Sequence, residues 1–303
     1  MKRVAIVYSS RSEEGLLRPV IRRLREVPGV EVLEMFNTEN CDPQSLGFRY
    51  LEFWHLFKLE KPDLVFCSFD RKEMLPVAYA AFLQNIPVAQ IHAGDISLEG
   101  TWDDLVRHAI SLMATLLFCN GNSSHGRMLI TLHNLGRTME WCKDHVFETG
   151  STALDDIAPD YTDVPEKDSF DLVLYSAPTT HPEVIDDELK QIDALLNKRT
   201  LIIGPTVDPG ADRVSEWGWV HRNDNPLVYW YYPGVRREIF LALMDRCDRF
   251  IGNSSSIWTE SLAFKERSKL IPIGVRNQGR DFIKPEKGGS DRIVQHVREF
   301  LGE

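Results

Sequence analysis

Short apolar runs alternate with amphipathic stretches along this chain, and this alternation narrows the possible folds more than any other feature. Residues 4–8 form a short apolar run, and a helical pattern of leucine, valine and isoleucine with intervening arginines follows over 16–25. A buried strand followed by an amphipathic helix is the repeating unit of an α/β domain with a parallel sheet. The same pattern predicts further strands over 30–35, 64–67, 86–92 and 116–119, and helices over 74–84 and 103–113.

The pattern restarts after a polar, proline-containing stretch over 158–170. Strands are then expected over 172–175, 201–204, 227–232, 249–252 and 270–273, and helices over 186–196, over 236–247, from about 256 and over 291–301. We therefore predict an α/β fold with two Rossmann-like domains, 1–157 and 158–303, each built on a parallel sheet. We expect the two domains to face each other across a cleft, and the last helix to pack back on the N-terminal domain.

The composition of the chain excludes several classes of protein. The net charge of −10 makes non-specific nucleic-acid binding a poor expectation. The N-terminal apolar run is too short for a signal peptide and no run approaches 18 apolar residues, so we expect a cytoplasmic protein without a membrane partner. Five cysteines without a CxxC pair indicate reduced thiols, and no histidine spacing resembles a zinc site, so we expect no metal.

Polar residues follow several of the predicted strands, where ligands bind to open parallel sheets. Arg11, in a serine-rich loop that opens a helix, is a candidate to bind an anion, although the serines of this loop could simply cap the helix. Asp70 and Asp95 each follow a strand, and Asp95, directly after a glycine, is the better candidate for proton transfer. Asp103 begins a helix, where an acid also stabilises the helix dipole.

Two further clusters lie in the second half. His181 follows the strand over 172–175, although a lone histidine is more often structural. The turn over 252–256 reads Gly-Asn-Ser-Ser-Ser and precedes a predicted helix that contains Glu260. Hydroxyl and backbone N–H groups at such a turn can hold a diphosphate, while Ser254 or Ser255 could alternatively serve as helix caps.

Motifs of three other enzyme classes are absent. The sequence contains no GxxxxGKS/T, so it is not a P-loop NTPase, and no GxGxxG follows the first strand, which argues against a dinucleotide oxidoreductase. No GxSxG is present, which disfavours a serine hydrolase of the α/β-hydrolase type.

Taken together, the clusters resemble the hydrolysing UDP-N-acetylglucosamine 2-epimerases, which have the GT-B fold. The resemblance spans nearly the whole chain and rests on segments in the family's order: SRSEEGLL (10–17), DRKEML (70–75), IPVAQIHAGD (86–95), DDLVRHAI (103–110), GSTALD (150–155), His181-Pro182 and GNSSS (252–256). It implies an enzyme that releases UDP and N-acetylmannosamine by eliminating UDP and then adding water with inversion at C2. It implies no metal or redox cofactor, and we expect a homo-oligomer, namely a dimer.

The resemblance also implies roles for individual residues. Asp95 and Asp103 become candidates for proton transfer or charge stabilisation, with Asp70 assisting them. His181 is expected to contact the diphosphate or to carry a proton. The residues expected to bind the UDP-sugar are Arg11, Arg71, Arg107, Ser254, Ser255, Glu260 and Arg276.

The chain departs from the family pattern at several places. Asp95 stands where the family usually has Glu, Ile257 replaces a glycine, and Thr206 replaces an asparagine. The stretch over 30–61 is shorter than usual, and we expect a helix or lid to be missing there. Three alternatives stay open: an epimerase for a related UDP-HexNAc such as a diacetamido sugar, a GT-B glycosyltransferase, and a nucleotide-binding regulator without catalysis.

Overall fold

The structure is a computed structural model, and it describes residues 1–37, 43–98, 102–156, 158–162, 164–165, 169–205, 208–283 and 286–303. The side chains of Arg11, Ser12 and Pro43 lie outside the described part. The chain forms two compact units. Unit 1 comprises Met1–Asp95, Asp103–Asp156 and Glu286–Glu303, and unit 2 comprises Ile96–Trp102 and Ile157–Pro285.

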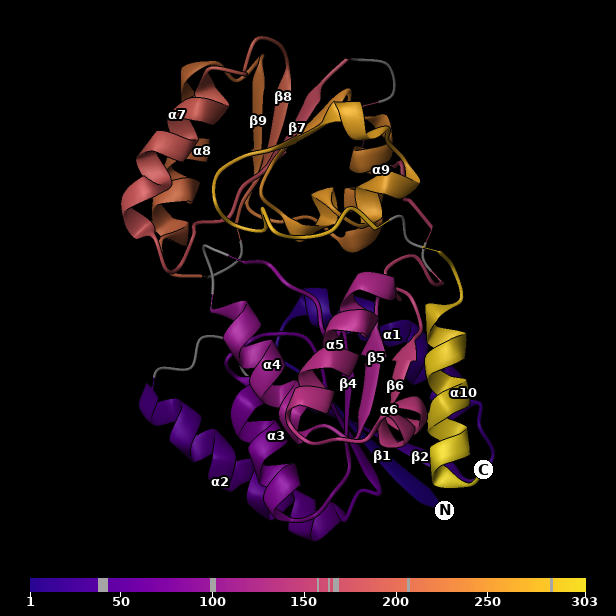
Figure 1. Cartoon of the computed structure of the whole chain (residues 1–303). Coiled ribbons are helices and arrows are strands. Elements are labelled where there is room, and N and C mark those ends of the chain that lie inside the picture. The colour runs from indigo at the N-terminus through magenta and orange to yellow at the C-terminus, as the bar shows by residue number, and fades with distance from the viewer. Residues whose placement is uncertain are drawn as a thin grey trace. The chain divides into compact units, whose positions relative to one another are not determined.

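Unit 1 is built on a six-stranded sheet in the order β2-β1-β3-β4-β5-β6. Figure 1 shows β4, β5 and β6 of this sheet side by side. Every pair in this sheet is parallel. Its strands are β1 (Lys2–Tyr8), β2 (Val30–Phe36), β3 (Leu64–Cys67), β4 (Val88–Ile91), β5 (Leu116–Cys119) and β6 (Val146–Glu148). The chain passes from β1 to β2 on one side and then to β3 on the other, so the carboxyl ends of β1 and β3 form the point where ligands bind to sheets of this kind.

Helices cover both faces of this sheet. They are α1 (Arg11–Arg25), α2 (Pro43–Glu60), α3 (Met74–Leu83), α4 (Asp103–Met113), α5 (Asn122–Asn134), α6 (Met139–His145) and α10 (Gly289–Leu301). Successive residues of β1 point to opposite faces: Val4 and Ile6 belong to the core cluster that contains α1 and α10, whereas Ala5 and Val7 belong to the one that contains α2 to α5. Because both faces of the sheet are covered, the inner strands β3 and β5 are continuously apolar and fully buried, as the sequence suggested.

The C-terminal helix α10 is an integral part of unit 1. It packs against α1, and its apolar side chains Ile293 and Val297 are fully buried in the same cluster as those of α1. The carboxylate of Asp155 accepts hydrogen bonds from the backbone N–H groups of Gly288 and Ser290, each at 2.7 Å, and so holds the start of the helix. The last residues of the chain therefore complete the core begun by the first ones.

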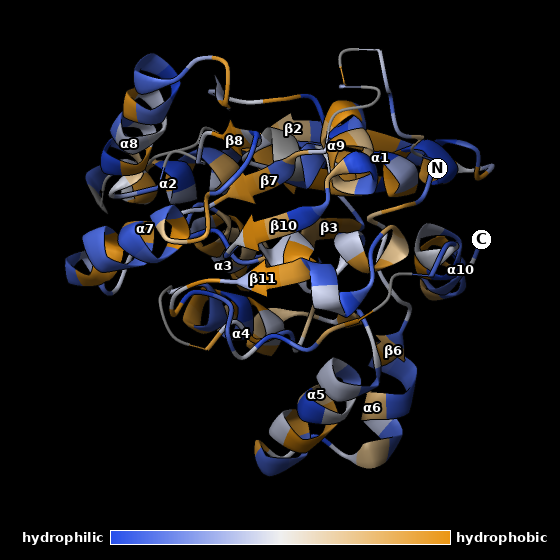
Figure 2. Cartoon of the chain, turned by 90° about the horizontal axis from the view of Figure 1, so that it is seen from above, coloured by the Kyte–Doolittle hydropathy of each residue, from blue (hydrophilic) through white to orange (hydrophobic). Residues whose placement is uncertain are grey.

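Unit 2 contains a five-stranded parallel sheet in the order β11-β10-β7-β8-β9. Its strands are β7 (Asp171–Leu174), β8 (Thr200–Ile203), β9 (Tyr229–Tyr232), β10 (Arg249–Gly252) and β11 (Leu270–Pro272), and its α-helices are α7 (Ile185–Asp193), α8 (Ala211–Asp224) and α9 (Arg237–Arg246). Apolar residues concentrate in β7, β10 and β11 while the helices carry both polar and apolar residues (Figure 2). In this sheet β8 and β9 are added on one side of β7, and β10 and β11 on the other. The point at which the strand order reverses therefore lies between β7 and β10.

The predicted fold class is confirmed: both units are α/β with parallel sheets. The helix predicted from about Ser256 is wrong, because this segment forms only short 3-10 turns, Ser255–Ile257 and Glu260–Ala263. The Ser254 hydroxyl bonds the Ser256 side chain at 2.7 Å and the Thr259 hydroxyl bonds the Ser255 carbonyl at 3.1 Å. Such local side-chain bonds compete with α-helical pairing.

Four helices were not expected from the sequence: α2, α5, α6 and α8. The stretch in which we expected a missing helix or lid contains the 18-residue helix α2. Thr206 lies outside the described residues. None of the helices within the described ranges is long and apolar enough to span a lipid bilayer.

Candidate active site

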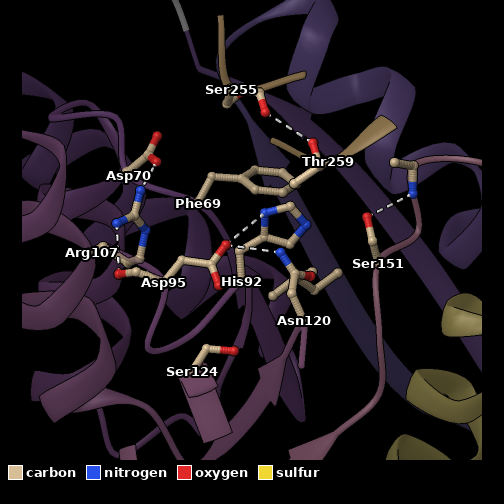
Figure 3. Close-up of polar contacts among 12 residues, drawn as sticks. Phe69, Asp70, His92, Asp95, Arg107, Asn120, Ser124, Ser151, Ser255 and Thr259 are labelled. Atoms are coloured by element: carbon tan, nitrogen blue, oxygen red, sulfur yellow. Dashed lines mark hydrogen bonds and ion pairs between the residues drawn. The ribbon is translucent and has the colours of Figure 1, made fainter. Parts of the chain in front are cut away.

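A buried arginine gathers several acids at the carboxyl edge of the unit 1 sheet. Arg107, on α4, is only 1% exposed. Its guanidinium forms ion pairs with Asp70, after β3, and with Asp104 at 2.5 Å, and it donates to the backbone oxygen of Asp95 at 2.9 Å (Figure 3). Burial alone would lower the pKa of Arg107, but the surrounding carboxylates, including that of Asp103, raise it above its ordinary value. Arg107 therefore stays charged and holds these acids close together.

The backbone around Asp95 is held in an unusual conformation. Gly94 has a φ of +75°, and a Cβ at this position would overlap the backbone oxygen of Ser124. His92 also has a positive φ, +63°, which is rare for a residue with a side chain. This turn lets the chain double back directly after β4, so that Asp95 ends up buried at 6% exposure.

Two side chains that sequence reasoning missed contact the Asp95 carboxylate. Asn120, which follows β5, donates from Nδ2 to Oδ2 of Asp95 at 2.8 Å. His92 Nδ1 lies 3.7 Å from the same oxygen, and its ring meets that of Phe69 edge-on (Figure 3). Because β4 and β5 are neighbours in parallel register, with Ile91 opposite Phe118, residues just beyond their carboxyl ends meet.

Arg71 lies in a second charged group at the end of β3. Its Nε is 3.4 Å from a carboxylate oxygen of Glu73, which is fully buried. A nearby acid, Glu13 of α1, was not singled out from the sequence. Its carboxylate accepts from Ser9 N at 2.6 Å, Ser9 Oγ at 2.8 Å and Ser10 N at 3.1 Å. Burial raises the pKa of Glu13 to about 7, although the Ser9 donors and Arg71 act in the opposite direction.

The Glu13 contacts shape the loop on which Arg11 lies. Ser10 accepts a hydrogen bond from the Glu13 backbone at 3.2 Å while the Glu13 carboxylate accepts from the backbone of Ser10, which is a capping box. Ser10 thus caps the helix, which is the alternative interpretation of this serine-rich loop. The Arg11 side chain lies outside the described part, and α1 begins at this residue.

In unit 2, the corresponding turn follows β10. Gly252 has a φ of +140°, and a Cβ there would overlap the backbone oxygen of Leu174 in β7, so glycine is required. Asn253 then ties the two strand ends together: its side chain accepts from Ser176 N and donates to Ser176 O, each at 2.8 Å. Ser254 and Ser255 follow directly at this switch point.

Two charged residues predicted to bind UDP lie in unit 2, Glu260 at the start of a 3-10 turn and Arg276 in the segment after β11. The carboxylate of Glu260 is 3.2 Å from Arg237 and accepts from the Thr259 hydroxyl. Burial opposes its ionisation, but Arg237 and these donors outweigh burial and lower the pKa of Glu260. Arg276 donates to the backbone oxygen of Ala177 at 2.9 Å and pairs with Asp208 at 3.1 Å.

The remaining predicted residue, His181, lies on the surface of unit 2. It precedes a short 3-10 turn, and its side chain is 43% exposed. Its Nδ1 is 3.2 Å from a carboxylate oxygen of Glu183. In the described ranges, no group of three or more His, Cys, Asp or Glu side chains is arranged to hold a metal ion.

A comparison with protein families shows the family to which the chain belongs. The model of the family described as UDP-N-acetylglucosamine 2-epimerase matches residues 44–300. The chain belongs to this family. The resemblance inferred from the sequence is thus confirmed, and the protein is an enzyme of the UDP-N-acetylglucosamine 2-epimerase family.

Individual relatives of this epimerase-family chain are distant. UDP-N,N'-diacetylbacillosamine 2-epimerase (hydrolyzing) of Legionella pneumophila is 24% identical over 359 residues, covering 100% of this chain and 90% of the relative. GDP/UDP-N,N'-diacetylbacillosamine 2-epimerase (hydrolyzing) of Campylobacter jejuni is 30% identical over 256 residues, covering 79% of this chain and 63% of that protein. UDP-N-acetylglucosamine 2-epimerase of Neisseria meningitidis is 22% identical, covering 94% of this chain and 82% of the relative.

Solved structures agree on the fold. The S. aureus MnaA–UDP co-structure has a TM-score of 0.79 at 15% identity, with 100% of this chain and 97% of that chain covered. UDP-GlcNAc 2-epimerase of Methanocaldococcus jannaschii, in complex with UDP-GlcNAc and UDP, has a TM-score of 0.73 at 15% identity, with 98% and 99% covered. The α/β architecture of this epimerase-family member is therefore that of the family.

Proposed function

We propose that this chain is a hydrolysing 2-epimerase that converts UDP-N-acetylglucosamine to UDP and N-acetylmannosamine. The observation that carries the proposal is the group of acids that buried Arg107 holds at the carboxyl edge of the unit 1 sheet. Acids at a strand end, held in place by a fixed cation, suit a reaction in which protons move while positive charge builds on a sugar ring.

The proposed chemistry has two stages. A carboxylate removes the proton from C2, the C2–H electron pair forms a C1=C2 double bond, and the C1–O bond breaks as UDP leaves with its electrons. Water then adds its oxygen to C1 and gives up one proton to a carboxylate, while the C1=C2 electron pair takes a proton at C2 from the opposite face. We assign the proton transfers to Asp95 and Asp103, with Asp70 stabilising the developing charge.

The leaving group needs donors, because the barrier falls only if the departing diphosphate is stabilised. We assign this role to Arg11 and Arg71 of unit 1 and to Ser254, Ser255 and Arg276 of unit 2, and we assign the ribose hydroxyls to ionised Glu260. His181 would contact the diphosphate or carry a proton. For Arg107 we propose that it acts through the acids, because its guanidinium already contacts Asp70 and Asp104.

The names of two relatives favour a second candidate substrate. The Legionella and Campylobacter proteins are both named as hydrolysing epimerases of diacetylbacillosamine nucleotides. This chain could therefore act on a UDP-diacetamido sugar by the same chemistry, since the added acetamido group is remote from C1 and C2.

Incubation with each UDP-sugar in heavy water, followed by NMR, tests the proposal. The expected result is UDP plus a free sugar of inverted C2 configuration with deuterium at C2. Whichever sugar turns over faster identifies the substrate. Sugar transfer that occurs only when an acceptor is added would instead identify a glycosyltransferase. Tight UDP binding without any turnover would identify a regulator.

We also propose that the chain assembles as a homodimer. Large apolar side chains are exposed on the packed helices α2 and α3, namely Phe48, Leu51, Tyr79 and Phe82 at 47–63% exposure. Clustered apolar exposure of this kind is typical of a protein interface. Light scattering of the purified chain and of a Phe48→Lys, Phe82→Lys variant tests this: the first should be dimeric and the second monomeric.

A further inference from the structure

Asn120 is placed to control the Asp95 carboxylate. Its side chain is 4% exposed, that of Asp95 is 6% exposed, and a hydrogen bond of 2.8 Å joins them. A carboxylate accepts hydrogen bonds only, so the amide must present its N–H to Asp95 and its oxygen must point elsewhere. The orientation of the Asn120 amide is therefore fixed by the acid.

The surroundings of the Asn120 amide oxygen, Oδ1, indicate more than a purely structural role for this side chain. Asn120 Oδ1 is buried and finds no hydrogen-bond partner among the residues that the structure describes. A buried asparagine that serves packing normally uses both its donor and its acceptor, because an unpaired buried oxygen is unfavourable. At Asn120, only the N–H that faces the acid is used.

Arg107 contacts Asp95 through a different group from the one it contacts in the neighbouring acids. Arg107 contacts the side chains of Asp70 and Asp104, but its hydrogen bond to Asp95 goes to the backbone oxygen. The neutral Asn120 amide donates to the Asp95 side chain at 2.8 Å, and His92 Nδ1 lies 3.7 Å from the same carboxylate oxygen. A neutral donor fixes the direction of a carboxylate without cancelling its negative charge, which is what a base requires.

We infer that Asn120 is a positioning residue for proton transfer by Asp95, holding the short carboxylate in the one orientation from which it can reach the substrate. The inference rests on the proposed function for its catalytic part, since the proton transfer is the proposed one. The contact itself does not depend on that function and can be tested separately.

We expect two substitutions of Asn120 to lower kcat by different amounts. Asn120→Leu keeps the volume and removes the donor, and we expect kcat to fall by about 10- to 100-fold with KM changed by less than about twofold, because misorientation of a reacting group lowers the rate steeply. Asn120→Asp places a second carboxylate against Asp95 and should lower kcat further. Asn122→Asp makes the same chemical change at an exposed position two residues away and should leave kcat unchanged.

A double-mutant cycle tests whether Asn120 acts through Asp95. In an Asp95→Asn background, Asn120→Leu should change the rate of deuterium incorporation at C2 by less than about twofold, because the group that it positions is gone. Equal fold-losses in both backgrounds would overturn the inference, as would an Asn120→Leu enzyme with wild-type kcat.

Unfolding by urea provides a readout that needs no turnover. If Asn120 holds the carboxylate, the stability changes of Asn120→Leu and Asp95→Asn do not add in the double variant; strict additivity overturns the contact on which the inference stands. Absence of turnover by the wild type on both UDP-sugars, with non-additive stabilities, would refute the proposed function and leave the Asn120–Asp95 contact supported.

Discussion

Glu13 is expected to make unit 1 less stable as the pH rises from about 4.5 to about 7. In the folded protein its buried carboxyl keeps a proton up to about pH 7, whereas an ordinary glutamate in the unfolded chain releases it near pH 4.5. Between these values the native state binds more protons than the unfolded state, so the free energy of unfolding falls with rising pH. Below pH 4.5 this contribution is fully present, and above pH 7 it is lost.

The magnitude follows from the two pKa values. Their difference of about 2.5 pH units corresponds to about 3 kcal/mol at about 1.36 kcal/mol for each unit. For a domain of about 150–250 residues, this equals a shift of about 6–12 °C in the unfolding midpoint. The Glu13→Gln variant has no proton to lose and retains the acceptor that the capping box needs.

The assay is the thermal-unfolding midpoint of both proteins measured between pH 4.5 and pH 8. The midpoint of Glu13→Gln relative to the wild type should rise by about 6–12 °C across this range. Glu14→Gln, in the same helical turn but paired with Arg18, controls for the loss of a first-turn negative charge. Parallel midpoint curves for Glu13→Gln and wild type would refute the reasoning, because they would mean that Glu13 is already ionised at low pH.

Three further substitutions have defined outcomes in thermal or urea unfolding. Arg107→Leu leaves Asp70 and its neighbours without their buried partner and should lower the free energy of unfolding by about 3–5 kcal/mol. Gly94→Ala forces a Cβ against Ser124 at a positive φ and should destabilise by more than about 1 kcal/mol; a wild-type midpoint would contradict the geometry. Asp155→Ala removes the acceptor at the start of α10 and should cost about 1–2 kcal/mol, with a larger loss at low salt as a further sign of its charge.

The strand pattern was readable from the sequence because buried parallel strands are apolar on both faces. The run over 64–67 is fully buried, as is that over 116–119. Helix α2 was harder to infer: its apolar side chains are spread around the helix, and several of them, such as Phe48 and Leu51, are exposed. A helix without a single apolar face gives no clear period.

The positions of Asp70 and Asp95 at strand ends could be predicted, but their partners could not. Asn120 is 25 residues from Asp95 in sequence, and the two meet only because β4 and β5 are adjacent in the sheet. The unusual character of Glu13 could not be inferred from the sequence for another reason. An acid in the first turn of a helix is ordinary, and only its burial, which depends on tertiary packing, makes it unusual.

The return of α10 to unit 1 has a consequence for biosynthesis. During translation, α1 emerges early, but the apolar surface that Ile293 and Val297 cover stays open until α10 has left the ribosome. The first unit of this chain therefore cannot finish folding co-translationally in the usual N-to-C order. Its core stays incomplete while Ile157–Pro285, the larger part of unit 2, is made.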